Sequence, residues 1–422
     1  MYKTKNELKS GRALFPPRSE HSATPEMVKA AIGRCGFGWM RLREYRNCAR
    51  IADVALELCS RMAMRSKSAV DPWAMLGGAL AGPLVIGFAE RCIKTAEQNG
   101  IKNIFFTARD GWLVKKAVEA LAGERGLTCR YVYSPRTYSY LLAYEKADLK
   151  KHGLDRFLEM IEEAAPGSLP EWKKRKIPAA DKRKLVLENW SRLDGKRAHT
   201  DAVFRNYIGQ LRDGLGGDRK VLLVDGISGQ NSAERLYRKY WDAPLFALYF
   251  NCDGADGKTR FAYCDGGTSV SPLSFFEFFL SAPTPPIVGI SDDGAPLFRS
   301  SPQNDRIASV FGRMESGFEA FLAEYTALYS DAEGLFPVDE VIDFFNRYLD
   351  TLDDRELALF EDTFLPGNSA ESRFLTMADK IYKPFLRIGS TFGMRMRKTE
   401  SSFVLLWSFR GHSHTLLRLI RR

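Results

Sequence analysis

The sequence predicts an α/β protein with a doubly wound, mainly parallel sheet, a helical insertion and a C-terminal helical domain. Two stretches, residues 101–133 and 220–250, each have the order short apolar strand, polar loop, amphipathic helix, strand. Strands that are joined through helices in this way favour parallel pairing within one sheet. A hydrophobic share of 45% and a charged share of 27% are typical of a globular chain, and exclude a fibrous or disordered one.

The chain has 422 residues, which is more than one hydrophobic core normally serves. We expect a mobile arm over residues 1–25, where two adjacent prolines and mixed charge stop a helix. An α/β domain follows over residues 26–300, with the helical insertion at 145–200. Residues 301–422 are expected to form a C-terminal helical region that ends in a basic tail.

Two helices are predicted before the first strand. Apolar residues recur at helical spacing over residues 45–64, and this pattern predicts an amphipathic helix. Asp71 followed by Pro72 is typical of an N-cap and the first residue of a helix. That second helix carries three glycines that would allow close packing against a neighbour: Gly77, Gly78 and Gly82.

The first strand–loop–helix–strand unit predicts a strand over residues 101–106, a polar loop over 107–111 and a second strand over 129–133. Arg109 in the loop has the forked guanidinium that binds phosphate or carboxylate oxygens, and Gly111 lets the backbone approach a ligand. Asp110 either contacts a ligand or caps the following helix. Arg136 follows the second strand, so we expect it at the same edge of the sheet.

The second unit predicts a strand over residues 220–224 and a loop over 225–232 that opens a helix. A helix N-terminus and a glycine-containing backbone together favour an anion, so this loop is a candidate phosphate cradle. The alternative is a tight turn without a ligand. Neither common nucleotide-binding glycine pattern is present. The expected ligand-binding residues of this loop are Gly226, Ser228, Gly229, Gln230 and Ser232.

Three carboxylates are candidate catalytic residues. Asp110 and Asp225 each follow a predicted strand, so both would lie at one sheet edge and together hold Mg²⁺ beside a phosphorylated substrate. Glu277 lies in the aromatic run 275–280, where burial would raise its pKa and suit it to general acid or base work. The alternative for Glu277 is an exposed position on an aromatic helix.

These loops give the chain a family resemblance. The stretches IKNIFFTARDGWLVKKAVEAL and KVLLVDGISGQNSAERLY are similar to the region that follows the haloacid-dehalogenase-like domain in large bacterial proteins linked to surface-polysaccharide gene clusters. The likeness extends over roughly residues 75–300. Members often carry a phosphatase-like domain with a D-x-D-x-T motif; that motif is absent here, so the aspartyl-phosphate phosphatase reaction is not expected.

The resemblance implies a bacterial protein of cell-surface polysaccharide biosynthesis. Together with the two polar loops and a formal charge of +10, it predicts a transferase acting on a phosphorylated or nucleotide-activated sugar, on a Rossmann-like or phosphoribosyltransferase-like fold. A phosphoribosyltransferase-like enzyme is one alternative, although Gly226 stands where that family has a second acidic residue. A non-catalytic, membrane-adjacent scaffold of glycan assembly is another. Nucleic acid is not an expected partner, because no recognised binding module accompanies the charge.

A cytoplasmic location is expected, since neither a secretory signal nor an apolar run of about 18 residues is evident. The tail over residues 402–422 mixes aromatic, aliphatic and basic side chains, as segments at a membrane interface do. It would allow peripheral contact with the inner face of the membrane. The competing interpretation of this tail is an ordinary last helix packed on the core.

Overall fold

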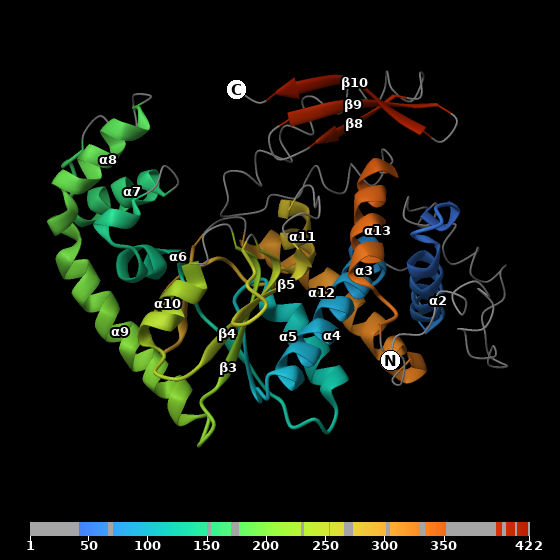
Figure 1. The fold of residues 1–422 in the computed structure, drawn as a ribbon, viewed down its shortest axis with the longest axis horizontal. Coiled ribbons are helices and arrows are strands. Elements are labelled where there is room, and N and C mark those ends of the chain that lie inside the picture. Colours follow the sequence, from blue (N-terminus) through green and yellow to red (C-terminus); the bar gives the residue numbers. More distant parts are fainter. Residues whose placement is uncertain are drawn as a thin grey trace.

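The computed structural model describes residues 42–65, 71–149, 153–169, 177–228, 232–252, 254–265, 273–300, 304–329, 334–351, 394–398, 402–409 and 412–420. The predicted arm over residues 1–25 lies outside these described residues. Figure 1 shows a central sheet with helices on both sides of it.

Five parallel strands form the central sheet, in the order β2-β1-β3-β4-β5. The strands are β1 (Asn103–Thr107), β2 (Thr128–Val132), β3 (Val221–Ser228), β4 (Leu245–Cys252) and β5 (Arg260–Asp265). The predicted α/β fold with a doubly wound parallel sheet is therefore confirmed. Both strand–loop–helix–strand units seen in the sequence contribute to this one sheet.

Successive side chains along the strands pack into two separate cores, one on each face of the sheet. In β1, Ile104 and Phe106 belong to one core, whereas Phe105 between them belongs to the other. All three side chains are fully buried. Because successive side chains of a strand point to opposite faces, a strand that is apolar throughout must be covered on both sides. This explains why the strands read as continuous apolar runs.

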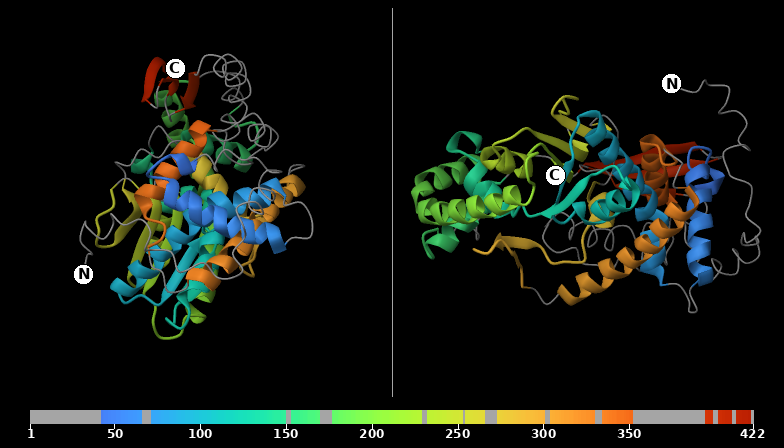
Figure 2. Two further views of the ribbon diagram at one scale, coloured as in Figure 1. Left: turned by 90° about the vertical axis from the view of Figure 1, so that its right-hand side faces the viewer. Right: turned by 90° about the horizontal axis from the view of Figure 1, so that it is seen from below.

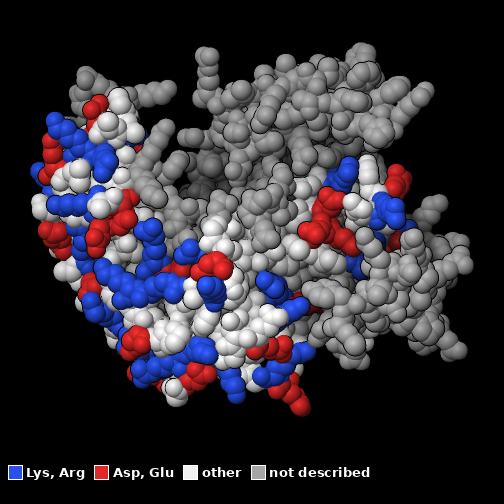
Figure 3. Space-filling view, in the orientation of Figure 1, with Lys and Arg blue, Asp and Glu red and all other residues white. Residues whose placement is uncertain are grey.

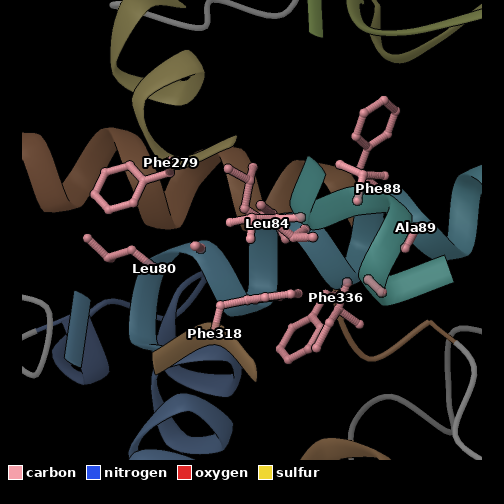
Figure 4. Close-up of a cluster of buried hydrophobic side chains, with 14 of the residues drawn as sticks. Leu80, Leu84, Phe88, Ala89, Phe279, Phe318 and Phe336 are labelled. Atoms are coloured by element: carbon pink, nitrogen blue, oxygen red, sulfur yellow. The ribbon is translucent and has the colours of Figure 1, made fainter. Parts of the chain in front are cut away.

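The larger core lies between one face of the sheet and eight helical segments, which come from before the first strand, from within the sheet region and from after residue 300. Leu84 lies near the centre of the cluster in Figure 4, with side chains from neighbouring helices around it. The segments are α2 (Ala49–Arg65), α3 (Pro72–Leu76), η3 (Gly77–Ala81), α4 (Gly82–Gln98), α5 (Gly111–Ala122), α11 (Leu273–Leu280), α12 (Asn304–Tyr329) and α13 (Val338–Thr351). Of the C-terminal region expected over residues 301–422, the described helices α12 and α13 pack into this same core.

The crossing of α3 and η3 with α12 is made at glycines, as the sequence predicts for this helix. A Cβ added to Gly77 would lie 2.7 Å from the backbone carbon of Met314, so only a hydrogen fits there. Gly317 of α12 lies equally close to the backbone of Ala74. Figure 2 shows the long orange helix α12 beside these blue helices. The predicted N-cap is also present, because Asp71 accepts hydrogen bonds from the backbone N–H groups of residues 73 and 74.

The second core covers the other face of the sheet and contains the predicted helical insertion. Its elements are α6 (Arg136–Tyr138), η4 (Ser139–Ala143), η5 (Lys146–Asp148), α7 (Leu154–Ala164), α8 (Ala179–Glu188), η6 (Trp190–Leu193), α9 (Asp194–Asp213) and α10 (Ser232–Tyr240). A hairpin of β6 (Ile287–Ile290) and β7 (Pro296–Phe298) is fixed to this core where Tyr138 hydrogen-bonds both backbone groups of Ile290.

The C-terminal tail corrects one expectation. The last helix expected over residues 402–422 is wrong, because β8 (Met394–Lys398), β9 (Ser402–Phe409) and β10 (His412–Ile420) form a three-stranded antiparallel sheet. Short apolar runs cannot be assigned to helix or strand by periodicity alone, and aromatic and β-branched residues such as Phe403, Val404 and Trp407 favour a strand. Contact of this tail with a membrane stays a prediction.

One helical stretch, Pro72–Gln98, is long and apolar enough to cross a membrane by length and composition. Most of it is buried inside the protein, among the helices of the larger core. A core helix of a globular protein has the same length and composition, so this stretch is weak evidence for a membrane span.

Candidate functional site

The strand order places a topological switch point between β1 and β3. The chain leaves β1 toward β2 on one side and leaves β3 toward β4 on the other, so the two connections diverge. In open parallel sheets this divergence leaves room for a ligand outside the carboxyl ends of the two strands. The two loops that the sequence singles out, after β1 and within the β3–α10 connection, flank this point. The strand ends that carry both loops are therefore brought to one sheet edge.

The ends of β1 and β3 are joined by side chains as well as by the sheet. The Thr107 hydroxyl lies 2.6 Å from Asp225 Oδ1 and 3.1 Å from the Val224 carbonyl oxygen, so its single proton can be donated to either. The backbone N–H of Gly226 donates to the same Asp225 oxygen at 3.0 Å. The predicted start of the second loop, at residue 225, is too early. Residues 225–228 belong to β3, which pairs with β4 as far as Ser228.

Burial raises the pKa of Asp225 above its ordinary value. The hydrogen bonds from Thr107 and Gly226 lower the pKa, and so does the positive charge of Arg136, while the charge of Glu234 raises it. The net shift is upward. A carboxyl group that holds its proton more tightly than usual, at the switch point of a sheet, is suited to exchange that proton with a substrate or to lose it to a cation.

Asp110 lies directly over Gly226, which joins the two loops. A Cβ added to Gly226 would overlap the Asp110 carboxylate and lie 2.8 Å from Asp110 Cβ. Glycine at 226 is therefore needed for the close approach of this carboxylate to β3. The predicted cap is wrong: Asp110 precedes α5 in a helical conformation, and its side chain makes no capping hydrogen bond to that helix.

Gly111 has a packing role in the same loop. A Cβ at this position would lie 2.7 Å from Phe106 Cβ and 2.9 Å from the Phe106 backbone carbon. The chain must therefore turn tightly from β1 into α5, and the turn holds Arg109 and Asp110 at the strand end. Gly111 therefore shapes the candidate site through this turn, since its own neighbours are atoms of Phe106.

Arg109 presents an unsatisfied donor at this edge. Its Nη1 atom is buried and has no hydrogen-bond partner among the described residues, and the side chain as a whole is half-buried. Buried polar atoms nearly always have a partner, and a missing one costs about 1–3 kcal/mol. Two hydroxyl groups are also buried without a hydrogen-bond partner among the described residues: those of Tyr131 on β2 and of Ser134 just after β2.

Arg136 begins α6 after β2 and is exposed. Its positive charge is near enough to Asp225 to lower the pKa of that carboxyl group, against the larger effect of burial, which raises it. The sequence prediction that Arg109 and Arg136 project to one edge agrees with this electrostatic contact.

The other predicted residues of the second loop are only partly placed. Ser228 lies at the end of β3, where its backbone pairs with Cys252. Ser232 is the first residue of α10 and is half-buried. Gly229 and Gln230 lie outside the described residues, so the proposed backbone cradle over residues 226–232 stays a prediction.

Glu277 lies on α11, a helix that contacts both β3 and α5. Phe276 and Phe279 on this helix are fully buried, whereas Glu277 is half-buried. The carboxylate is thus neither enclosed by the aromatic run nor fully exposed. The helix brings it toward the elements that carry the two loops, and its catalytic role stays a prediction.

One buried carboxylate at this end of the sheet was missed by the sequence reasoning. Glu234 of α10 is 1% exposed and forms two parallel hydrogen bonds with Arg260, each 2.9 Å long. Arg238 Nε and the Tyr249 hydroxyl each donate to it at 2.7 Å. Burial raises the pKa of Glu234, but these hydrogen bonds outweigh burial and leave the pKa below its ordinary value. The cluster fixes α10 to β4 and β5.

Basic and acidic side chains are mixed on the face of the protein that Figure 3 shows. Lys and Arg side chains crowd the part of this face that contains α8 and α9, with Asp and Glu among them. Four basic residues of α8 and α9 form ion pairs: Lys182 with Asp155, Lys196 with Glu163, Arg205 with Asp201, and Arg212 with Asp242. These paired side chains are weaker candidates for anion binding than the edge at β1 and β3.

The two carboxylates at this edge, Asp110 and Asp225, could supply only some of the ligands of a cation. Asp110 and Asp225 both border Gly226, and Mg²⁺ is commonly bound by one or two carboxylates with the remaining ligands from phosphate and water. Within the part of the chain that the structure describes, no group of three or more His, Cys, Asp or Glu side chains is placed to hold a metal. The geometry suits a cation that arrives with a phosphorylated ligand.

Comparison of the chain with protein-family models and with curated proteins found no match.

Proposed function

We propose that this protein is an enzyme that binds a phosphorylated or nucleotide-activated sugar at the carboxyl edge of β1 and β3 and transfers the sugar to an acceptor. The observation that carries the proposal is the packing of Asp110 onto Gly226, which brings the arginine-bearing loop and the aspartate of β3 to the switch point of the sheet. The assignment to cell-surface polysaccharide assembly rests on the sequence resemblance.

The charges at this edge support a phosphate ligand. Arg109 offers a buried, unsatisfied N–H, and Arg136 adds a second positive charge that acts on Asp225. A guanidinium group can donate hydrogen bonds to two oxygens of a phosphate at once, and these hydrogen bonds are stronger where water is excluded. Asp110 and Asp225 would repel a bare phosphate, so we propose that Mg²⁺ accompanies the ligand and is held by these two carboxylates.

The chemistry follows from these roles. In the transfer, the bond between the anomeric carbon and the phosphate oxygen breaks, and the acceptor hydroxyl oxygen bonds to that carbon. The leaving phosphate keeps the electron pair and is stabilised by Arg109 and Arg136. The acceptor proton passes to a carboxylate, and Glu277 is the candidate because Asp225 is engaged with the cation.

Isothermal titration calorimetry with UDP-glucose and with glucose 1-phosphate, each with and without Mg²⁺, tests the proposal. We expect binding by the wild type and a loss of at least about tenfold in affinity in Arg109→Ala, since a charged hydrogen bond is removed. Arg205→Ala is the matched control, because Arg205 is an exposed arginine of α9 paired with Asp201. Equal affinity in the wild type and Arg109→Ala would contradict the proposed site.

A further inference from the structure

Two of the unsatisfied buried polar atoms belong to one neighbourhood. The Nη1 atom of Arg109 and the hydroxyl of Tyr131 are both buried and both without a hydrogen-bond partner among the described residues. Burial raises the pKa of Tyr131, and the positive charge of Arg109 opposes this rise, as expected for a guanidinium near the phenol. Both side chains are half-buried overall, although these two polar atoms are themselves buried.

The backbone and the neighbouring rings hold this pair in place. The Ala108 N–H donates to the Val132 carbonyl at 2.9 Å, which fixes the start of the arginine-bearing loop onto the end of β2. Tyr131 precedes that carbonyl by one residue. Its ring makes edge contacts with Trp112, at a centroid distance of 5.0 Å, and with Tyr133, at 5.9 Å. The phenol is thus oriented by two aromatic rings.

Glu315 of α12, whose charge also acts on Tyr131, already has partners of its own. Its Oε1 atom accepts a hydrogen bond from Trp112 Nε1 at 2.6 Å and forms an ion pair with Lys116 at 2.5 Å. Burial is the largest cause of the high pKa of Tyr131, and the carboxylate of Asp110 raises it further. The phenol therefore keeps its proton at neutral pH and can donate that proton in a hydrogen bond to an incoming acceptor.

We propose that Arg109 and Tyr131 bind the same oxyanion, the phosphate of the ligand, and that Tyr131 is a phosphate-binding residue of this protein. This inference rests on the proposed function and extends the site from the β1–β3 edge toward β2. A phosphate offers an oxygen to the guanidinium and another to the phenol, and it satisfies both buried donors in one step. The phosphate then lies on the β2 side of Asp110, with the sugar directed toward β3.

The test is the variant Tyr131→Phe, which removes a single oxygen atom. Leaving out an unsatisfied buried hydroxyl is neutral or stabilising, so we expect no fall in the thermal unfolding midpoint of this variant. Its affinity for UDP-glucose and for inorganic pyrophosphate, measured by calorimetry, should fall about tenfold. Tyr45→Phe is the control, since Tyr45 packs with the helices of the larger core and not at the sheet edge.

The outcomes separate this inference from the proposed function. If the wild type binds both probes and Arg109→Ala weakens binding while Tyr131→Phe does not, the role of Tyr131 is wrong and the proposed site stands. If Tyr131→Phe lowers the unfolding midpoint and leaves affinity unchanged, Tyr131 is structural and the inference is also wrong. If the wild type binds neither probe, the proposed function is wrong and this inference falls with it.

Discussion

The hydroxyl of Thr107 at the end of β1 lies 2.6 Å from Oδ1 of Asp225 in β3. Thr107 is almost completely buried, so this contact connects the two strands beneath the candidate site. It holds the Asp225 carboxyl group in one orientation, with the Gly226 N–H on the same oxygen. The site is thus supported from below by a polar link that depends on the parallel pairing of β1 and β3.

Asp225→Asn should stabilise the protein at neutral pH. The pKa of Asp225 is raised in the folded protein, so its contribution to stability is present below the ordinary carboxyl pKa of about 4 and is lost as the pH rises through the raised value. Asparagine keeps an oxygen that accepts from Thr107 and Gly226 but carries no charge. Urea unfolding at pH 4 and pH 7 should show a gain for the variant that is larger at pH 7. A gain that is equal or smaller at pH 7 would show that the carboxylate is not disfavoured by burial.

Gly226→Ala should weaken both ligand binding and folding. The added methyl group would overlap the Asp110 carboxylate and lie 2.8 Å from Asp110 Cβ. Because the position of Asp110 Cβ is fixed by the backbone, the backbone must shift as well, and we expect a loss of about 1–3 kcal/mol in the free energy of unfolding. Affinity for UDP-glucose with Mg²⁺ should fall about tenfold. An unchanged affinity, with unfolding measured on the same sample, would exclude Asp110 from the binding site.

Glu234→Gln should destabilise the protein, because a buried carboxylate with two arginine partners is lost. We expect a cost of about 2 kcal/mol at pH 7, below the usual cost of breaking a fully buried pair since both arginines are partly exposed. The pKa of Glu234 is lowered, so its contribution is present above about pH 4.3 and is lost as the pH falls through the lowered value. The difference between variant and wild type in urea unfolding should therefore shrink from pH 7 to pH 3; a constant difference would contradict the account.

The helix crossing of α3 with α12 predicts opposite effects for two glycines of the same helix. A Cβ at Gly317 would overlap the Ala74 carbonyl oxygen and lie 2.6 Å from Ala74 Cα, so Gly317→Ala should cost about 1–3 kcal/mol or more. A Cβ at Gly312 would meet nothing within 4 Å, so Gly312→Ala should stabilise by up to about 1 kcal/mol through helix propensity. Thermal unfolding of both variants measures this, and a similar effect at the two positions would rule out the close crossing.

Four of the five strands of the sheet are predicted from the sequence because each is a local pattern, whereas β5 lies in a stretch that reads as turn-rich. The continuous apolar run of β1 and the spacing of buried residues in α5 depend on neighbours along the chain. The start of α3 was predicted for the same reason, since Asp71 and Pro72 define a cap by their chemistry alone. The shared edge of the two loops followed from the rule that parallel strands present their carboxyl ends together.

The contacts that sequence reasoning missed are long-range. Nothing local shows that Glu234 meets Arg260, because the partners come from different elements and meet only in the folded sheet. The close approach of Asp110 to Gly226 required the strand order, which places β3 rather than β2 on that side of β1. The strands of the tail were missed because its short apolar runs suit a helix equally well.

A crystal structure of the protein with UDP-glucose and Mg²⁺ tests the central claim most directly. The account predicts phosphate oxygens within hydrogen-bonding distance of Arg109 and the ligand over Gly226, at the carboxyl edge between β1 and β3. A ligand bound at the amino edge of the sheet, or against the basic face of the helical insertion, would contradict it.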